Sequence, residues 1–134
     1  MKIVWNKVIP VKGFYAITVI KWIFVRDEYQ GSQGSESFKR MIRHESIHEQ
    51  QILDWTPKTF PEWLRYTIGS ILFYPTYVVE WLIKFIIAAC KKFEIDAYKS
   101  ISYEQEAYNN EDDLNYLENR KKFSWLKYIF KTCK

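Results

Sequence analysis

The longest apolar stretch of the chain, residues 70–90, constrains the fold more than any other feature. As a helix it would be about 30 Å long, enough to cross the hydrocarbon core of a bilayer. Pro75, Glu80 and Lys84 interrupt it. A chain of 134 residues builds one modest core, and the central helix of such a core is apolar on nearly all sides. We therefore favour a buried core helix over a membrane span.

The composition is that of a folded protein and argues against several classes of function. Hydrophobic residues make up 48% of the chain and charged residues 27%, which predicts a single domain over residues 1–134. The net charge of +4 is too small and too dispersed for nucleic-acid binding. The two cysteines form no disulfide framework, and residues 1–25 lack the pattern of a signal peptide. We expect a cytoplasmic protein, with peripheral membrane contact as an alternative because the tail, residues 123–134, is aromatic and basic.

The N-terminal third is predicted to hold two short strands and one helix. Residues 3–9 and 14–25 are rich in β-branched and aromatic side chains, although the second run is also compatible with a short buried helix. A helix is expected from about residue 35 to residue 55, because Pro57 disfavours helical geometry in the residue before it.

Capping-box patterns predict the starts of two further helices. Thr59 and Glu62 mark one start, and Pro75 is expected to kink or restart that helix. Ser102 and Gln105 mark the start of a last helix, over residues 102–120. The chain is therefore expected to be α+β and mostly helical, with a short N-terminal β-hairpin or small sheet.

The chain has two histidines, His44 and His48, and they belong to a His-Glu-x-x-His motif in the first expected helix. Residues four apart on a helix share one face, so both imidazoles can bind a single Zn²⁺ ion. Glu45 lies beside them, turned away enough not to be a ligand but close enough to accept a proton from a zinc-bound water. This arrangement is typical of metallopeptidases.

A zinc site of this kind needs a third protein ligand, and no histidine remains. Asp54 follows His48 too far along the same straight helix, about 9 Å, to reach the ion. Glu104 and Glu106 on the last helix are better placed, because a second helix can pack against the first. At 100° per residue, Glu106 lies about 60° from the centre of that helix's apolar stripe and Glu104 about 100°, so geometry alone slightly favours Glu106.

The two motif helices together resemble a known family. His44-Glu45-x-x-His48 followed by Glu104-x-Glu106-Ala107-Tyr108 resembles the motifs of the glutamate-liganded zinc peptidases, the gluzincins. It is also similar to small bacterial zincin-like proteins with a Glu-x-Glu-Ala-Tyr element. The resemblance implies a minimal zincin-like domain in which Glu104 is the third ligand, with Glu106 as the alternative. Tyr108 stands where the family has an aspartate that orients a ligand histidine, and its hydroxyl is expected to take that role.

Two further charged residues, Glu80 and Arg43, have either a structural or a functional explanation. Glu80 is the one acid in an apolar helix, and it is expected to pair with Lys84 four residues on, or else to serve the metal site. Arg43, next to the motif, is either an ordinary surface charge or a group that binds a substrate carboxylate.

These residues predict a zinc-dependent metallopeptidase that acts on a peptide or protein substrate. An edge strand from the run 14–25, placed beside the zinc, would pair with an extended substrate backbone. The alternative is a non-catalytic metal-binding or membrane-associated interaction protein on the same scaffold. Cleavage preference and oligomeric state have no signal in the sequence.

Overall fold

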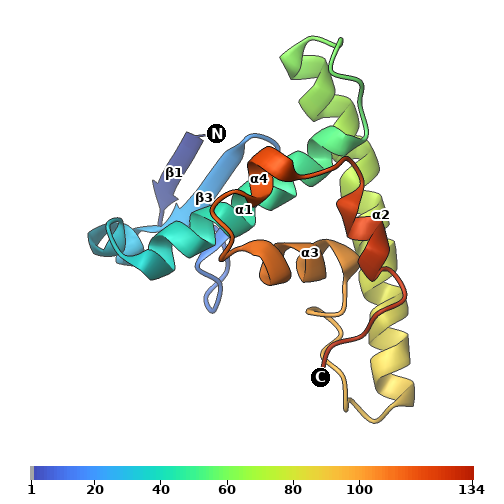
Figure 1. The fold of residues 1–134 in the computed structure, drawn as a ribbon. Helices are drawn as coiled ribbons and strands as arrows, with labels where there is room; N and C mark the ends of the chain where they lie inside the picture. The colour runs from blue at the N-terminus through green and yellow to red at the C-terminus, as the bar shows by residue number, and fades with distance from the viewer. Residues whose placement is uncertain (1) are drawn as a thin grey trace.

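The computed structural model describes residues 2–134 and has an α+β fold that is mostly helical, which confirms the predicted fold class (Figure 1). Its elements are β1 (Lys2–Asn6), β2 (Ala16–Val19), β3 (Trp22–Arg26), the 3-10 helix η1 (Asp27–Ser32), α1 (Glu36–Asp54), α2 (Glu62–Cys90), α3 (Ser102–Asn110), α4 (Tyr116–Asn119) and the 3-10 helix η2 (Ser124–Tyr128). Helix α1 packs against the sheet, α2 and α3, so it is the centre of the molecule.

The small sheet has the strand order β1-β3-β2, with β1 parallel and β2 antiparallel to β3. The prediction of one strand over residues 14–25 is wrong, because this run contains β2, a tight turn and β3. Ile20 takes a left-handed backbone conformation in that turn, with φ of 60°. β1 stops at Asn6 because the side chain of Asn6 accepts hydrogen bonds from the backbone N–H groups of Val8 and Ile9 and turns the chain.

Helix α1 begins and ends close to the predicted residues. The hydroxyl of Ser35 accepts a hydrogen bond from the backbone N–H of Phe38, and the helix ends shortly before Pro57. Phe38 packs against β3 near one end, while Ile52 near the other belongs to the main core cluster. Helix α2 crosses α1 at Gly69, where a Cβ atom would overlap the carbonyl of Ile52. This close approach fixes α1 between the sheet and α2.

Helix α2 runs unbroken through Pro75, so the predicted restart at Thr76 is wrong. Proline removes one backbone donor from the helix. Beside it, the Thr76 hydroxyl bonds to the carbonyls of Leu72 and Phe73, which supports the preceding turn instead of starting a new helix.

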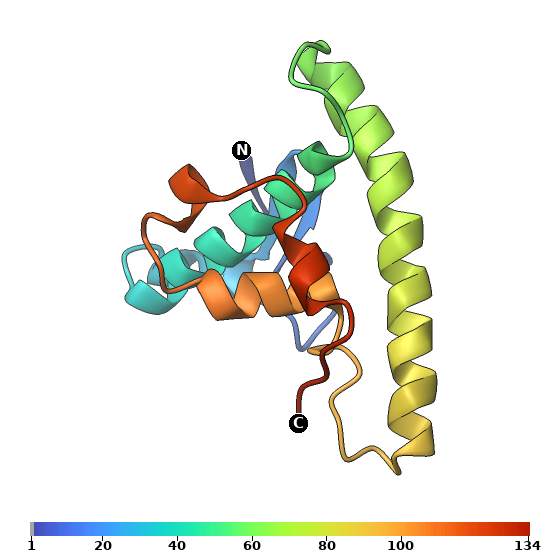
Figure 2. The ribbon, with the colours of Figure 1, turned by 45° about the vertical axis from the view of Figure 1, so that its right-hand side comes forward.

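The expected burial of α2 on all sides is also wrong. Only 22% of its most apolar 18-residue stretch is buried, and Figure 2 shows the other elements along one side of the helix. Glu80 and Lys84 both face this inner side, but each bonds to a neighbouring element instead of to the other. The ammonium of Lys84 donates to the backbone carbonyls of Ile129 and Lys131. The expected partner of Lys84 was Glu80, but the hydrogen-bond acceptors of its ammonium group come from the C-terminal segment instead.

Neither predicted capping box, at Thr59 or at Ser102, is formed. Pro61 precedes α2 and Ile101 precedes α3, and neither helix is capped by the side chain of its N-cap residue. Instead, the carboxylate of Glu80 accepts hydrogen bonds from the backbone N–H and the hydroxyl of Ser102. Helix α3 is therefore capped by α2, which fixes its direction across the molecule.

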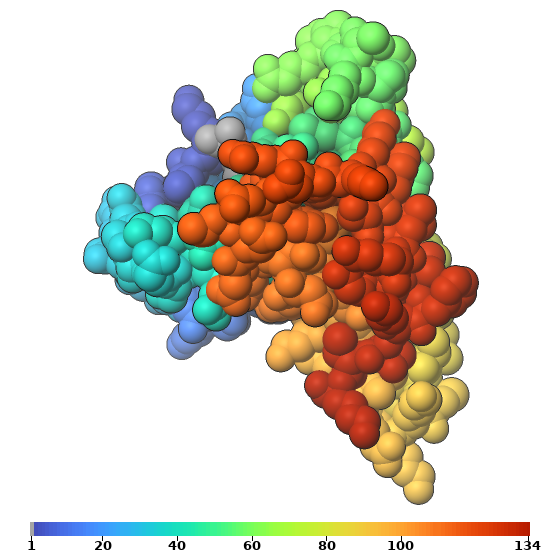
Figure 3. All heavy atoms as spheres, viewed as in Figure 1, coloured from blue at the N-terminus to red at the C-terminus, as the bar shows by residue number. Residues whose placement is uncertain are grey.

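The last helix is shorter than the predicted residues 102–120. A straight helix would carry Arg120 about 15 Å beyond the end of α3. The chain turns back after Asn110 instead, and Arg120 inserts its guanidinium between Asp54 of α1 and Glu106 of α3. The following segment returns over the face seen in Figure 3 and places Trp125 in the core. The other buried members of that core cluster are Ile52, Tyr66, Phe73, Ile101 and Tyr103.

Candidate metal centre

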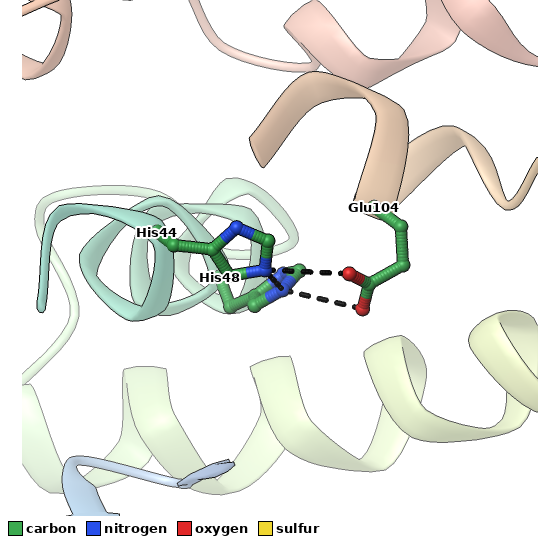
Figure 4. Close-up of side chains that lie close together, drawn as sticks. All are labelled: His44, His48 and Glu104. Carbon is green, nitrogen blue, oxygen red and sulfur yellow. Dashed lines mark hydrogen bonds and ion pairs between the residues drawn. The ribbon is translucent and has the colours of Figure 1, made fainter. Parts of the chain in front are cut away.

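His44 and His48 lie one helical turn apart on α1, and Glu104 points to them from α3 (Figure 4). The Nε2 atom of His44 is 3.3 Å from Oε2 of Glu104, and the Nε2 atom of His48 is 3.3 Å from Oε1 of the same carboxylate. The two Nε2 atoms are 3.2 Å apart. The three residues are 8%, 7% and 2% exposed, in that order. The fold thus brings both motif histidines to the glutamate that the family resemblance favours.

The other nitrogen of each imidazole is already engaged. The Nδ1 atom of His44 lies 2.8 Å from the carboxylate of Glu111, and that of His48 lies 2.7 Å from the amide oxygen of Gln51. Both partners are acceptors, so the Nδ1 atoms carry the protons. The amide nitrogen of Gln51 donates to the carbonyl of Tyr103, which fixes the orientation of the amide. In a neutral ring, each Nε2 atom therefore presents its lone pair to Glu104.

The electrostatics of the centre favour positive charge between these side chains. Burial disfavours the ionised form of Glu104, but the charges and hydrogen bonds of His48 and His44 outweigh it and lower the pKa of the carboxyl. Burial likewise opposes a charge on His44, yet hydrogen bonds to Glu104 and Glu111 raise its pKa to about 10. The charge of Glu104 also raises the pKa of His48 against the effect of burial. The carboxylate therefore holds protons, or another cation, at the two imidazoles.

The candidate ligand atoms lie close enough together to hold one metal ion. An ion bound at about 2.0–2.1 Å places its ligands about 3.3 Å apart. The two Nε2 atoms are 3.2 Å apart, and each lies 3.3 Å from a different oxygen of Glu104. One ligand atom from each of the three residues lies within 4.8 Å of the other two. The hydroxyl of Tyr77 donates to Oε1 of Glu104, whereas Oε2 is buried and has only the Nε2 atom of His44, 3.3 Å away, as a polar neighbour. Buried polar atoms are rarely left unpaired, and a cation would satisfy this one. His44, His48 and Glu104 form a group that can hold a metal ion.

Glu45 lies beside this group without being part of it. It is 7% exposed, and its Oε2 atom accepts a hydrogen bond of 2.7 Å from the hydroxyl of Thr18. Its negative charge contributes to the raised pKa values of His44 and His48, so the carboxylate is close to both rings. Thr18 belongs to β2, which is an edge strand of the sheet. The run 14–25 thus supplies an edge strand next to the motif.

Glu106 and Asp54, the other carboxylates weighed as ligands, belong to a separate buried cluster. The guanidinium of Arg120 binds both of them, with nitrogen–oxygen distances of 2.7 to 3.0 Å. Glu106 also accepts hydrogen bonds from Tyr116 and Gln51. These partners hold Glu106 away from the histidines, so the alternative third ligand is not part of the metal-binding group.

The expected roles of Tyr108 and Arg43 differ from what the structure shows. Tyr108 packs the edge of its ring against the imidazole of His44, with centroids 4.6 Å apart, and the hydrogen bond expected of it is made by Glu111. Arg43 donates to the backbone carbonyl of Glu111 and so holds the segment that carries this carboxylate. Its guanidinium is thus bonded within the fold and is not a free surface charge.

Sequence reasoning misses the residues that orient the centre. Gln51 follows His48 by three residues and thus shares its helix face, so helical spacing alone was sufficient to find it. Glu111 lies beyond the end of α3, and Tyr77 comes from α2, so no spacing within one element indicates either residue.

Two aromatic side chains from the loops, Phe14 and Tyr98, pack against each other near Glu104. Phe14, from the connection between β1 and β2, packs edge-on against Tyr98 with centroids 6.2 Å apart. Burial and the nearby charge of Glu104 raise the pKa of the Tyr98 hydroxyl. Two cavities of the described residues lie elsewhere, one of about 240 Å³ near Tyr29 and one of about 620 Å³ between α2 and Phe130. Neither is lined by the metal-binding group.

Comparison with protein families, curated proteins and solved structures finds no match to this chain.

Proposed function

We propose that the protein is a zinc-dependent metallopeptidase that acts on peptide bonds. The proposal rests mainly on one observation. Two imidazole nitrogens and one buried carboxylate lie within 4.8 Å of one another and can hold one metal ion, with Glu45 of the same motif beside them. The gluzincin-like sequence pattern supports the same interpretation.

The donor set favours zinc among common metals. Two neutral imidazoles and one carboxylate suit a tetrahedral Zn²⁺ site, whereas Mg²⁺ and Ca²⁺ prefer six or more oxygen ligands. Three protein ligands leave one position of the tetrahedron open, which distinguishes a catalytic from a structural zinc site. Gln51 and Glu111 provide the second layer of hydrogen bonds that such a site requires.

The chain itself supplies the base and its orientation. When bound, zinc supplies the positive charge that acidifies water and polarises a substrate carbonyl. The Glu45 carboxylate accepts the proton of the attacking water and passes it to the leaving amine. The hydroxyl of Thr18 holds one oxygen of Glu45 and leaves the other available for this transfer. The buried surroundings strengthen these electrostatic interactions.

The edge strand β2 is the candidate binding place for an extended peptide. The hydroxyl of Tyr74 on α2 donates to the carbonyl of Thr18 and accepts from the N–H of Ile20. The carbonyl of Thr18 and the N–H of Ile20, at the end of β2, therefore already have hydrogen-bond partners within the fold. A substrate strand would pair with the part of β2 that precedes Thr18, on the side towards Ala16.

A non-catalytic metal-binding protein is the second candidate. The observation that favours it is the burial of all three ligands, none more than 8% exposed, away from both cavities. In that case the ion would only tie α1 to α3.

The two candidates are distinguished by measuring metal content and hydrolysis on the same preparations. The parent protein is expected to bind one zinc per chain, and His48→Ala to lose it. Glu45→Gln should keep the zinc and lose hydrolysis of a peptide library by at least about a hundredfold. Glu118→Gln, on the exposed helix α4, is the matched control and should retain both.

Either of two results would contradict the peptidase. A parent protein that binds zinc but cleaves no peptide supports the non-catalytic alternative. Equal metal content in the parent protein and in His48→Ala would show that His48 does not bind the metal, which would contradict the metal centre itself.

A further inference from the structure

Helix α2 carries a continuous, exposed apolar face on the side away from the other elements (Figure 2). We call it the outer face; its residues are Ile71, Val78, Leu82, Phe85 and Ile86, between 44% and 64% exposed. At 100° per residue they span an arc of about 100°. Between Arg65 and Lys91 the only charged residues are Glu80 and Lys84, and both lie on the inner side. The outer face is thus free of charge over about 22 Å.

We propose that the outer face docks the protein on an anionic lipid bilayer, with the axis of α2 parallel to the membrane plane. Large uninterrupted apolar surfaces are uncommon on monomeric soluble proteins and mark interaction sites. A helix that is apolar on one side only, with polar elements packed on the other, sinks its apolar face to the level of the acyl chains.

Basic residues at both ends of α2 identify an anionic surface as the partner. Residues 58–65 and 91–94 each hold two basic residues and one acidic residue, so each end of the helix is net positive. The chain as a whole carries a charge of +4. Trp63 and Phe93, which are 68% and 63% exposed, lie at these same ends, and aromatic rings favour the interfacial layer of a membrane. Anionic headgroups would neutralise the basic ends while lipid covers the face between them.

A second copy of the chain fits this surface less well than lipid does. If two copies paired through the outer face, either helix direction would set a net positive end against a net positive end. Lipid satisfies the apolar face without this repulsion.

The packing on the inner side excludes a spanning orientation, although α2 is long and apolar enough to cross a membrane by length and composition. Lys84, near the middle of the apolar stretch, is bonded to the C-terminal segment, whose Lys127 and Lys131 lie close by in the chain. A spanning helix would carry these charges into hydrocarbon, at a high free-energy cost. An interfacial helix keeps them in water.

Docking would place the metal centre close to the membrane surface. Tyr77, on the inner side of α2, donates to the carboxylate of Glu104. The centre is therefore separated from the lipid by about one helix diameter, 10 to 12 Å. The proposal does not depend on catalysis, because the outer face contains no residue of the metal centre.

Vesicle flotation tests the proposal. The probes are phosphatidylcholine vesicles and vesicles of roughly three parts phosphatidylcholine to one part phosphatidylglycerol. The parent protein should float with the anionic vesicles, and less so with neutral vesicles or at high salt. Leu82→Glu places a charge in the outer face and should lower the bound fraction by about tenfold or more. Leu114→Glu, the same change at a position 73% exposed outside α2, should bind like the parent.

Three outcomes would overturn the proposal. The parent protein could stay at the bottom of the gradient with anionic vesicles, or Leu82→Glu could float as well as Leu114→Glu. A dimer in light scattering that Leu82→Glu dissociates would show a second copy on the face instead. Glu45→Gln should float like the parent, so loss of hydrolysis and loss of docking are separate results. Circular dichroism establishes that each variant is folded.

Discussion

The two candidate ligand histidines are oriented by residues outside the group that can hold a metal ion. The carboxylate of Glu111 fixes the proton on Nδ1 of His44, and the Gln51 amide does the same for His48. A carboxylate in this position also raises the basicity of the imidazole, which strengthens its bond to a metal.

Glu111→Ala tests this dependence at the residue scale. We expect zinc affinity to fall by about 10- to 100-fold while the stoichiometry at saturation stays at one, because the ligands remain but His44 is no longer oriented. Titration with a competing chelator measures the change. Asp112→Ala removes the neighbouring carboxylate, whose partner Arg40 is exposed, and should leave the affinity unchanged. Equal affinities for the two variants would show that Glu111 has no such role.

At the scale of elements, the position of Glu104 depends on how α3 is held against α2. Glu80 on α2 caps the first turn of α3, two residues before Glu104, through the N–H and hydroxyl of Ser102. The helix is nine residues long, and six of them, residues 102–107, are buried against the neighbouring elements. Its direction is therefore set by a contact between elements and not by its own sequence.

Glu80→Ala is expected to destabilise the fold and to weaken the metal site together. Loss of the cap should lower the free energy of unfolding by about 1 to 2 kcal/mol, measured by denaturant titration. Zinc affinity should fall as well, since the first turn of α3 carries the third ligand. Glu94→Ala, in the exposed loop between α2 and α3, is the control and should change neither quantity. A destabilised Glu80→Ala protein with the parent's zinc affinity would show that the cap does not position Glu104.

At the scale of the whole molecule, a bound ion would join α1 and α3, which lie far apart in the sequence. Binding to the folded chain alone stabilises it, by about 2.7 kcal/mol at a free ion concentration of 100 times the Kd. Removing the metal should therefore lower Tm in the parent protein and leave it unchanged in His48→Ala.

The effect of metal on Tm should also grow with pH. In the metal-free protein the pKa of His44 is raised from 6.5 to about 10. Its protonated form therefore stabilises the fold fully below pH 6.5, and this contribution is lost as the pH rises towards 10. Metal binding requires neutral imidazoles, so it strengthens over the same range. Calorimetry at about pH 6 and pH 8.5, with and without zinc, should show a larger Tm difference at the higher pH. An effect of zinc on Tm that decreases as the pH rises would contradict metal binding by the two histidines.

The sequence by itself determines the local features of this protein. The spacing of His44 and His48 on α1, the start of that helix at Ser35 and the mostly helical α+β class all follow from side chains that act within one or two turns. The tertiary structure decides the rest, because it depends on groups distant in the chain. The chain turns back after α3, and Arg120 then binds Glu106. Glu104, and not Glu106, therefore lies beside the two histidines. The elements that pack on one side of α2 leave the outer face exposed, and hydrophobicity alone does not predict which side of an apolar helix they cover.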